Sequence, residues 1–123
     1  MFAVGEVVAV VSDQAKNYRW KHKYHLCVCC RNNLYLFINS NPYEGSFQIT
    51  NAEFPSLPNA ISYISCNAVL TISDQYMRRY QAKSKGALPR DVLVRLMDHV
   101  NGCEVITEEE REQVVSSLAD ALR

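Results

Sequence analysis

The sequence predicts a mainly β domain with C-terminal helices, an α+β class, on two observations. Short runs of β-branched and aromatic residues recur roughly every ten residues through the first two thirds of the chain, with turn residues between them. Beyond Pro89 the apolar residues recur instead with a helical period. A chain of 123 residues has the usual size of one domain. We therefore expect a single domain over residues 1–123, with a small barrel or sandwich over residues 1–88 and helices over residues 89–122.

Several segments of the first two thirds have the composition of strands. Arg31-Asn32-Asn33 separates two apolar runs, and this pattern predicts a β-hairpin. Pro55 and Pro58 indicate a loop, because proline cannot donate a hydrogen bond to a strand ladder. The expected strands are residues 5–11, 26–30, 34–38, 47–50, 60–66 and 68–72.

Helices are expected in the last third. Pro89 suits the first turn of a helix whose apolar positions repeat with a 3.6-residue period, and Asn101-Gly102 ends it. Thr107 and Glu110 have the spacing of a capping box, in which each side chain accepts a hydrogen bond from the other residue's backbone N–H. This pattern begins a second helix, and an apolar stripe follows it to the end of the chain.

The cysteines are expected to be small buried hydrophobes. There are five, an odd number, at positions Cys27, Cys29, Cys30, Cys66 and Cys103. The spacing of the first three is not the C-x-x-C of a zinc knuckle. On a strand, Cys27 and Cys29 share one face and Cys30 lies on the other.

The charges are unevenly distributed although the net charge is zero. Residues 1–90 hold ten Lys or Arg and five Asp or Glu, whereas residues 91–123 hold three basic and eight acidic residues. A basic body indicates an anionic partner, nucleic acid first, although an acidic helix also serves solubility alone. The chain has no apolar run of the length a membrane span needs, and its first residues lack the basic start of a signal peptide. We expect a cytoplasmic protein without a membrane partner.

The segment over residues 16–41 is the first candidate for a functional surface. Alternating cations and aromatic rings can hold phosphates and stack on unpaired bases, so single-stranded RNA suits this segment. The alternative is a surface loop whose Trp20 packs into the core. The candidate side chains are Lys16, Arg19, Lys21 and Lys23 for phosphate, and Tyr18, Trp20 and Tyr24 for stacking.

The histidines offer proton transfer near neutral pH. On a strand, Lys23 and His25 point to the same face, so a phosphate-binding ammonium lies beside a possible acid or base. The alternative for His25 is a hydrogen-bonded residue at a strand edge. His22 is a second candidate for moving protons, and His99 is expected to be a solvated helix residue.

Five segments in one order carry a family resemblance. They are GEVVAV, KHKYHLCVC, the strand end INSN, SYISCNAVLTI and KGALPRDVLVRLMDHV. This order resembles the PemK/MazF toxin family over nearly the whole chain, and SYISCNAVLTI is its most specific part. The resemblance implies a small SH3-like β-barrel that acts as a metal-independent endoribonuclease without a cofactor. It also implies a homodimer and a cognate antitoxin protein as partners.

The resemblance also implies which residues act on RNA. Lys23, His25 and Ser40 are the candidate catalytic residues. The alternative function is a barrel that binds RNA or a protein without cutting, because Asn39 and Asn67 stand where the family has Thr and Asp, and Ser65 and Leu70 where it often has Arg. The candidate RNA-binding residues are Arg19, Trp20, Lys21, His22, Asn39 and Asn67.

Overall fold

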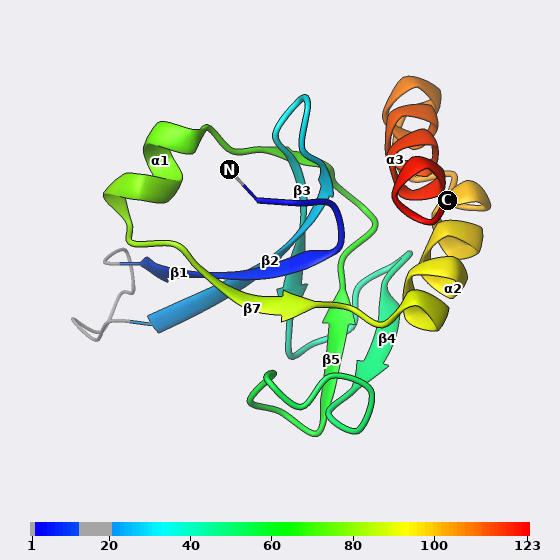
Figure 1. Ribbon diagram of the computed structural model, residues 1–123. Helices are drawn as coiled ribbons and strands as arrows, with labels where there is room; N and C mark the ends of the chain where they lie inside the picture. The colour runs from blue at the N-terminus through cyan, green and yellow to red at the C-terminus, as the bar shows by residue number, and fades with distance from the viewer. Residues whose placement is uncertain (1, 13–20) are drawn as a thin grey trace.

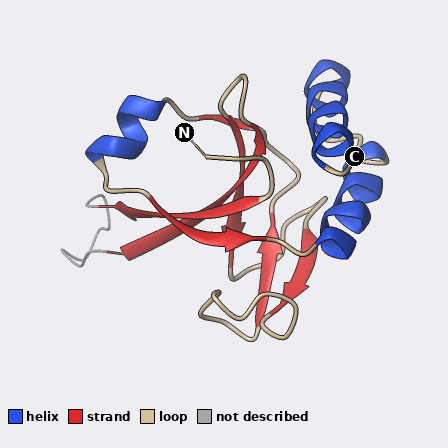
Figure 2. Ribbon diagram, in the orientation of Figure 1, coloured by secondary structure: helices blue, strands red, loops and turns tan. Residues whose placement is uncertain are grey.

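The computed structural model describes residues 2–12 and 21–123, with side chains described for residues 2–10 and 23–123. Its strands form one antiparallel sheet that curls into a half-barrel, accompanied by helices (Figures 1 and 2). The order of strands is β4-β5-β3-β2-β1-β7, and β6 also pairs with β3. The α+β class predicted from the sequence is therefore confirmed. The strands are β1 (Glu6–Ser12), β2 (Lys21–Cys29), β3 (Leu34–Asn39), β4 (Phe47–Thr50), β5 (Ile61–Ile64), β6 (Leu70–Thr71) and β7 (Lys83–Ala87).

Strand β2 begins at Lys21, five residues before its predicted start. Its first residues are polar and basic, but their backbone pairs with β1, where Lys21 lies opposite Ser12. Pairing with a neighbouring strand holds a segment of weak intrinsic strand preference in the extended conformation. The predicted strands over residues 60–66 and 68–72 are shorter than expected, because the segment over residues 65–69 is irregular.

Two elements lack the sequence signals of their class and were not predicted. Helix α1 (Asp74–Arg79) is too short to show a periodic pattern, although the Ser73 hydroxyl caps it by accepting from the Tyr76 N–H at 3.1 Å. Strand β7 has the polar sequence KSKGA, and every one of its residues is exposed. Its extended conformation depends on pairing with β1, where Lys83 lies opposite Ala9.

Helices α2 (Arg90–Asn101) and α3 (Glu108–Ala121) cover one face of the sheet (Figure 1). The buried cluster between them contains Val7, Leu26 and Leu36 from the strands, with Leu96 and Leu118 from the helices. These five side chains are at most 1% exposed, and burial of each contributes roughly 1.5–3 kcal/mol. The apolar face of both helices is therefore accounted for by core packing.

The ends of these helices follow the sequence signals closely. The predicted capping box is present: the Thr107 hydroxyl accepts from the Glu110 N–H at 3.1 Å, and the Glu110 carboxylate accepts from the Thr107 N–H at 3.0 Å. Pro89 is the N-cap of α2, one residue before the predicted first turn, and Gly102 is its C-cap. Within the described residues, no helix has the length and apolar character to cross a membrane.

A second, smaller cluster lies on the other face of the sheet. It packs Met77 of α1 against Val8, Val10, Cys27 and Tyr35. Helix α1 therefore covers part of the face that α2 and α3 leave open.

The predicted positions of the first three cysteines are wrong because β2 contains a bulge. The register between β2 and β3 shifts between Cys27 and Cys29, and an extra residue turns the following side chains to the opposite faces. Cys27 belongs to the smaller cluster, with Cys30 packed against it, whereas Cys29 belongs to the main core. As expected, the cysteines are small core residues, since Cys27, Cys29, Cys66 and Cys103 are all buried.

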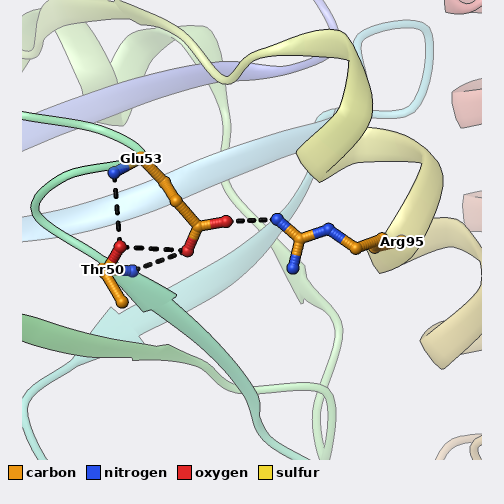
Figure 3. A network of polar contacts seen from close by, with 3 residues as sticks. All are labelled: Thr50, Glu53 and Arg95. Carbon is orange, nitrogen blue, oxygen red and sulfur yellow. Dashed lines mark hydrogen bonds and ion pairs between the residues drawn. The ribbon is translucent and has the colours of Figure 1, made fainter.

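A polar network joins the end of β4 to α2 (Figure 3). The Glu53 carboxylate accepts from the Thr50 N–H at 3.0 Å and from the Thr50 hydroxyl at 3.1 Å, and it pairs with Arg95 on α2. These hydrogen bonds and the Arg95 guanidinium lower the pKa of the Glu53 carboxyl. The network holds the turn after β4 against the helix layer.

His99 is not the solvated residue that the sequence predicted. Its Nε2 lies 2.7 Å from the Gly45 carbonyl oxygen, and its ring meets the Phe47 ring edge-on at 5.6 Å between centroids. His99 therefore links α2 to the chain before β4, a contact between residues 54 positions apart that the helix pattern alone does not indicate.

Candidate functional site

The candidate site lies on the face of β2 and β3 opposite α2 and α3. His25 is paired with Phe37 in the register of these strands, and Tyr24 and Leu26 point to the helix-covered face. The alternation predicted for Lys23 and His25 is therefore confirmed, because no register shift separates them. We call this surface the Lys23 face and define it by Lys23, His25, Phe37 and Asn39.

His25 is the most perturbed group on the Lys23 face. The residue is only 8% exposed, and its ring meets the Phe37 ring edge-on at 5.5 Å between centroids. Its Nδ1 atom is buried and has no hydrogen-bond partner among the described residues. Burial, with a smaller contribution from the Lys23 charge, lowers the pKa of the imidazole to about 4. His25 is therefore neutral at pH 7.

This environment decides which chemistry His25 can perform. A neutral imidazole has a lone pair and can accept a proton, but it cannot act as an imidazolium acid at neutral pH. The alternative of a hydrogen-bonded residue at a strand edge does not apply, because β2 lies between β1 and β3 and Nδ1 has no partner in the described part of the chain. An unsatisfied buried polar atom costs about 1–3 kcal/mol, which is a cost that a purely structural residue would avoid.

Lys23 is exposed two residues before His25 on the same strand face. Its ammonium is accessible to a phosphate from solvent, whereas the imidazole beside it is almost covered. The arrangement places one exposed cation next to one buried neutral base.

Asn39 lies at the end of β3, at the edge of the Lys23 face. Both polar atoms of its side-chain amide make hydrogen bonds. Its Nδ2 donates to the Ser65 hydroxyl at 2.8 Å, and its Oδ1 accepts from the Asn41 N–H at 2.8 Å. The Ser65 N–H in turn donates to the Phe37 carbonyl at 2.8 Å. Asn39 is half-buried, and its main contacts fix the end of β3 to the irregular segment after β5.

Asn67 lies beside this face in a hollow of about 320 Å³. Phe37 and Ser65 also line the hollow. Because the Ser65 hydroxyl accepts from the Asn39 amide, Asn67 lies in the neighbourhood of Asn39. Tyr43 and Leu70 add aromatic and apolar surface to it. An aromatic hollow with amide and hydroxyl groups at its wall suits a planar polar ring.

Ser40 lies in a different hollow. It follows the end of β3 and shares a space of about 230 Å³ with Tyr24, Ser62 and the loop over residues 57–59. Phe37 and Asn39 of the Lys23 face also line this space, together with Tyr24 of the opposite face, so Ser40 lies at the end of β3 where the two faces meet. Lys23 and His25 share one face of β2, and Ser40 is not among the residues that line the hollow beside Asn67.

The remaining predicted RNA-binding residues fall at the start of β2. Arg19 and Trp20 lie outside the described residues. Lys21 and His22 belong to β2 and lie opposite Ser12 and Val11 of β1, and their side chains are not described. Among the described residues, no group of three or more His, Cys, Asp or Glu is placed to hold a metal ion.

Phe37 and Ser65 contribute to the site although the sequence does not predict either of them as a site residue. Continued from the pair of Cys29 and Leu34 at the turn, the register would set Ile38 opposite His25, and the bulge between Cys27 and Cys29 brings Phe37 there instead. Ser65 depends on the irregular segment after β5, and its hydrogen bond to Asn39 joins residues 26 positions apart. No local pattern indicates that contact.

No protein-family model matches the chain, and no curated protein matches it. The assignment of the site therefore depends on its geometry, and the resemblance to PemK/MazF toxins remains a hypothesis.

Proposed function

We propose that this protein is a toxin-type endoribonuclease that cleaves single-stranded RNA through its 2′-hydroxyl group, without a metal ion. The observation that carries the proposal is the pair on the Lys23 face: an exposed ammonium next to a buried histidine that is neutral at pH 7. Cleavage of RNA by its own 2′-hydroxyl needs a base for that hydroxyl and a cation for the phosphate. The Lys23 face offers both.

The proposed reaction follows from these two roles. His25 accepts the proton of the 2′-hydroxyl, and the 2′-oxygen attacks the adjacent phosphorus. The bond from phosphorus to the 5′-oxygen breaks, and that oxygen takes a proton from water. The hydroxide that remains takes the proton from His25, which returns to its neutral form. Lys23 stabilises the charge that develops on the phosphoryl oxygens. The products are a 2′,3′-cyclic phosphate and a 5′-hydroxyl end.

The hollow beside Asn67 supports the choice of an unpaired base. Phe37 and Tyr43 present rings at its wall, and stacking of a base on an aromatic ring contributes roughly 1–3 kcal/mol. A base in a duplex is already stacked and paired, so it cannot enter such a hollow. Single-stranded RNA is the substrate that this geometry favours.

Incubation of the purified protein with an unstructured RNA in EDTA tests the proposal. We expect products that end in a cyclic phosphate, and a loss of roughly 100-fold in rate for Lys23→Ala, the size of effect seen when one preorganised donor is removed. His25→Phe should lose cleavage while keeping an aromatic ring against Phe37. Arg31→Ala, on the exposed turn between β2 and β3, is the matched control and should cleave like the parent. Equal rates for Lys23→Ala and the parent would exclude this assignment.

The alternative function is a barrel that binds RNA or a protein without cutting. Two observations favour it. The Asn39 amide is already hydrogen-bonded to Ser65 and Asn41, and the small exposed fraction of His25 limits the access of a 2′-hydroxyl to its ring. RNA that is retained by the protein but stays intact in EDTA supports this alternative.

The proposed toxin function also includes two protein partners, a second copy of the chain and a cognate antitoxin. An antitoxin with an acidic segment would complement the excess of Lys and Arg over residues 1–90. Coexpression with the neighbouring small open reading frame, followed by size-exclusion chromatography with light scattering, measures both associations. A protein that stays monomeric alone and in coexpression excludes them.

A further inference from the structure

A basic and aromatic strip runs from α1 into β7, outside the candidate site. Helix α1 is short and capped by Ser73, and β7 is held extended by its pairing with β1. Together they carry four cations and two tyrosines. We call it the α1–β7 strip. It consists of Tyr76, Arg78, Arg79, Tyr80, Lys83 and Lys85.

The four cations of the strip are exposed and available to a ligand. The ion pairs among the described residues are Arg95 with Glu53 and Arg123 with Asp120, so none involves the strip. Two carboxylates lie near the strip, Asp74 on α1 and Glu6 on the neighbouring strand β1. Glu6 is occupied by the Ser84 hydroxyl, and Asp74 is in the first turn of α1. The strip therefore keeps a clear positive excess.

The two tyrosines of the strip lie together at its helical end. Tyr76 and Tyr80 are four residues apart, and their ring centroids are 4.5 Å apart with a 45° tilt. The Arg79 guanidinium lies over the Tyr80 ring, with its Cζ 5.7 Å from the centroid. Tyr76 is 41% exposed, so part of its ring is accessible from solvent. An open aromatic ring beside guanidinium groups is a surface on which a base can stack.

Protection of the sheet edge explains only part of this strip. Strand β7 is an edge strand, and lysines on an edge strand prevent pairing with another chain. That role accounts for Lys83 and Lys85. It does not account for Arg78 and Arg79 on α1, or for the exposed Tyr76.

The strip adjoins the Lys23 face. Met77 fixes α1 on the face of the sheet that carries His25, through contacts in the cluster of Val8, Val10 and Cys27. Strand β7 is separated from β2 by β1 alone, a distance of about 10 Å at the usual spacing of strands. In the register with β1, Lys83 lies opposite Ala9, whose side chain is on the other face from Lys23. An extended strand of RNA on the Lys23 face can therefore reach α1 directly and the β7 lysines around the edge of the sheet.

We infer that the α1–β7 strip binds the nucleotides that flank the cleaved bond of a single-stranded RNA. This inference rests on the proposed function for the identity of the ligand. The cations bind phosphates and Tyr76 stacks on a base, so the strip contributes to RNA affinity and not to the chemical step.

The salt dependence of binding to a 20-nucleotide 2′-O-methyl RNA tests the cations, because this RNA cannot be cleaved through its 2′-oxygen. Each phosphate contact with a single strand contributes ~0.7 to the slope of log affinity against log salt. We expect that slope to fall by about 1.4 in Lys83→Gln/Lys85→Gln, and by the same amount in Arg78→Gln/Arg79→Gln. Arg31→Gln/Arg123→Gln removes two exposed cations outside the strip and should leave the slope as in the parent. Equal slopes for parent and strip variants would overturn the inference.

A second comparison tests the stacking. Tyr76→Ala should weaken binding of the 2′-O-methyl RNA about tenfold, whereas Tyr76→Phe keeps the ring and should bind like the parent. An abasic oligonucleotide of the same length should bind Tyr76→Ala and the parent equally. A loss with the abasic strand as large as with the RNA would contradict stacking at Tyr76.

These measurements separate the strip from the proposed activity. If the protein binds the 20-mer through the strip but cuts no RNA, the strip is an RNA site and the nuclease proposal is wrong. If the protein cuts RNA but the salt slopes are unchanged in both strip variants, the nuclease proposal is supported and the inference about the strip is wrong. Failure to bind the 20-mer even at low salt overturns both.

Discussion

His25 provides the most direct test of the physical reasoning, because its burial links its protonation to the stability of the fold. The perturbation is a change of pH from 7.5 to 4 in the parent and in His25→Phe. In the parent the imidazole must take up a proton in a buried site where its Nδ1 has no hydrogen-bond partner among the described residues and the Lys23 charge opposes protonation. In His25→Phe this proton uptake is absent, and the aromatic contact with Phe37 is kept.

The magnitude follows from the two pKa values of His25. Burial lowers the pKa in the folded protein from 6.5 to about 4. One unit of pKa corresponds to about 1.4 kcal/mol, so the complete effect on the free energy of unfolding is about 3 kcal/mol. The free energy of unfolding decreases in acid, because His25 in the unfolded chain already binds a proton near pH 6.5, whereas in the folded protein it does so only near pH 4. The parent is unaffected above that value, loses stability as the pH falls to 4, and loses no more from His25 below it.

Urea unfolding at a series of pH values, followed by circular dichroism, measures this loss. We expect the parent to lose about 3 kcal/mol more than His25→Phe between pH 7.5 and 4, which lowers its urea midpoint by a further 1–3 M, approximately. Carboxylates titrate in both proteins, so their contribution cancels in the difference. Parallel stability curves for the parent and His25→Phe would refute a buried neutral His25.

Three further changes test the packing and the local hydrogen bonds. Leu96→Ala leaves a cavity in a fully buried site and should lower the free energy of unfolding by about 2–5 kcal/mol in urea; a smaller loss would mean that α2 packs loosely on the sheet. Thr107→Ala removes the cap of α3 and should cost about 1 kcal/mol, read as a fall of about 4 °C in Tm, while Thr107→Ser should unfold like the parent. Glu53→Ala breaks the network with Thr50 and Arg95 and should lower the free energy of unfolding by about 1 kcal/mol. In a double-mutant cycle with Arg95→Ala the two losses should not add, and strict additivity would show that the pair contributes nothing to stability.

The elements that the sequence predicts well are those whose cause is local. Thr107 and Glu110 bind each other's backbone within one turn, so their identity and spacing are sufficient to place the start of α3. The hairpin turn before β3 is equally local, because Asn33 adopts a positive φ of 54° that asparagine tolerates. The pairing of Lys23 and His25 on one face needs only the period of a strand.

The elements that the sequence misses depend on partners distant in the chain. The bulge in β2 separates Cys27 from Cys29, and it arises from the register with β3, which no property of three adjacent small residues indicates. Strand β7 is extended because β1 pairs with it, although its own sequence is polar and contains Gly86. His99 was misjudged for the same reason, since its partner Gly45 precedes β4.

The sequence by itself determined six of the strands and the two long helices in their order along the chain, the ends of those helices, and the chemistry available on one face of β2. These follow from backbone preferences and from the periods of strands and helices, which act over a few residues. Only the tertiary structure decided what that chemistry can do. Packing against Phe37 makes His25 a neutral base, and the end of β3 turns Ser40 to another hollow. Burial and register are properties of neighbouring strands, so a pKa or a shared site appears only when the sheet is assembled.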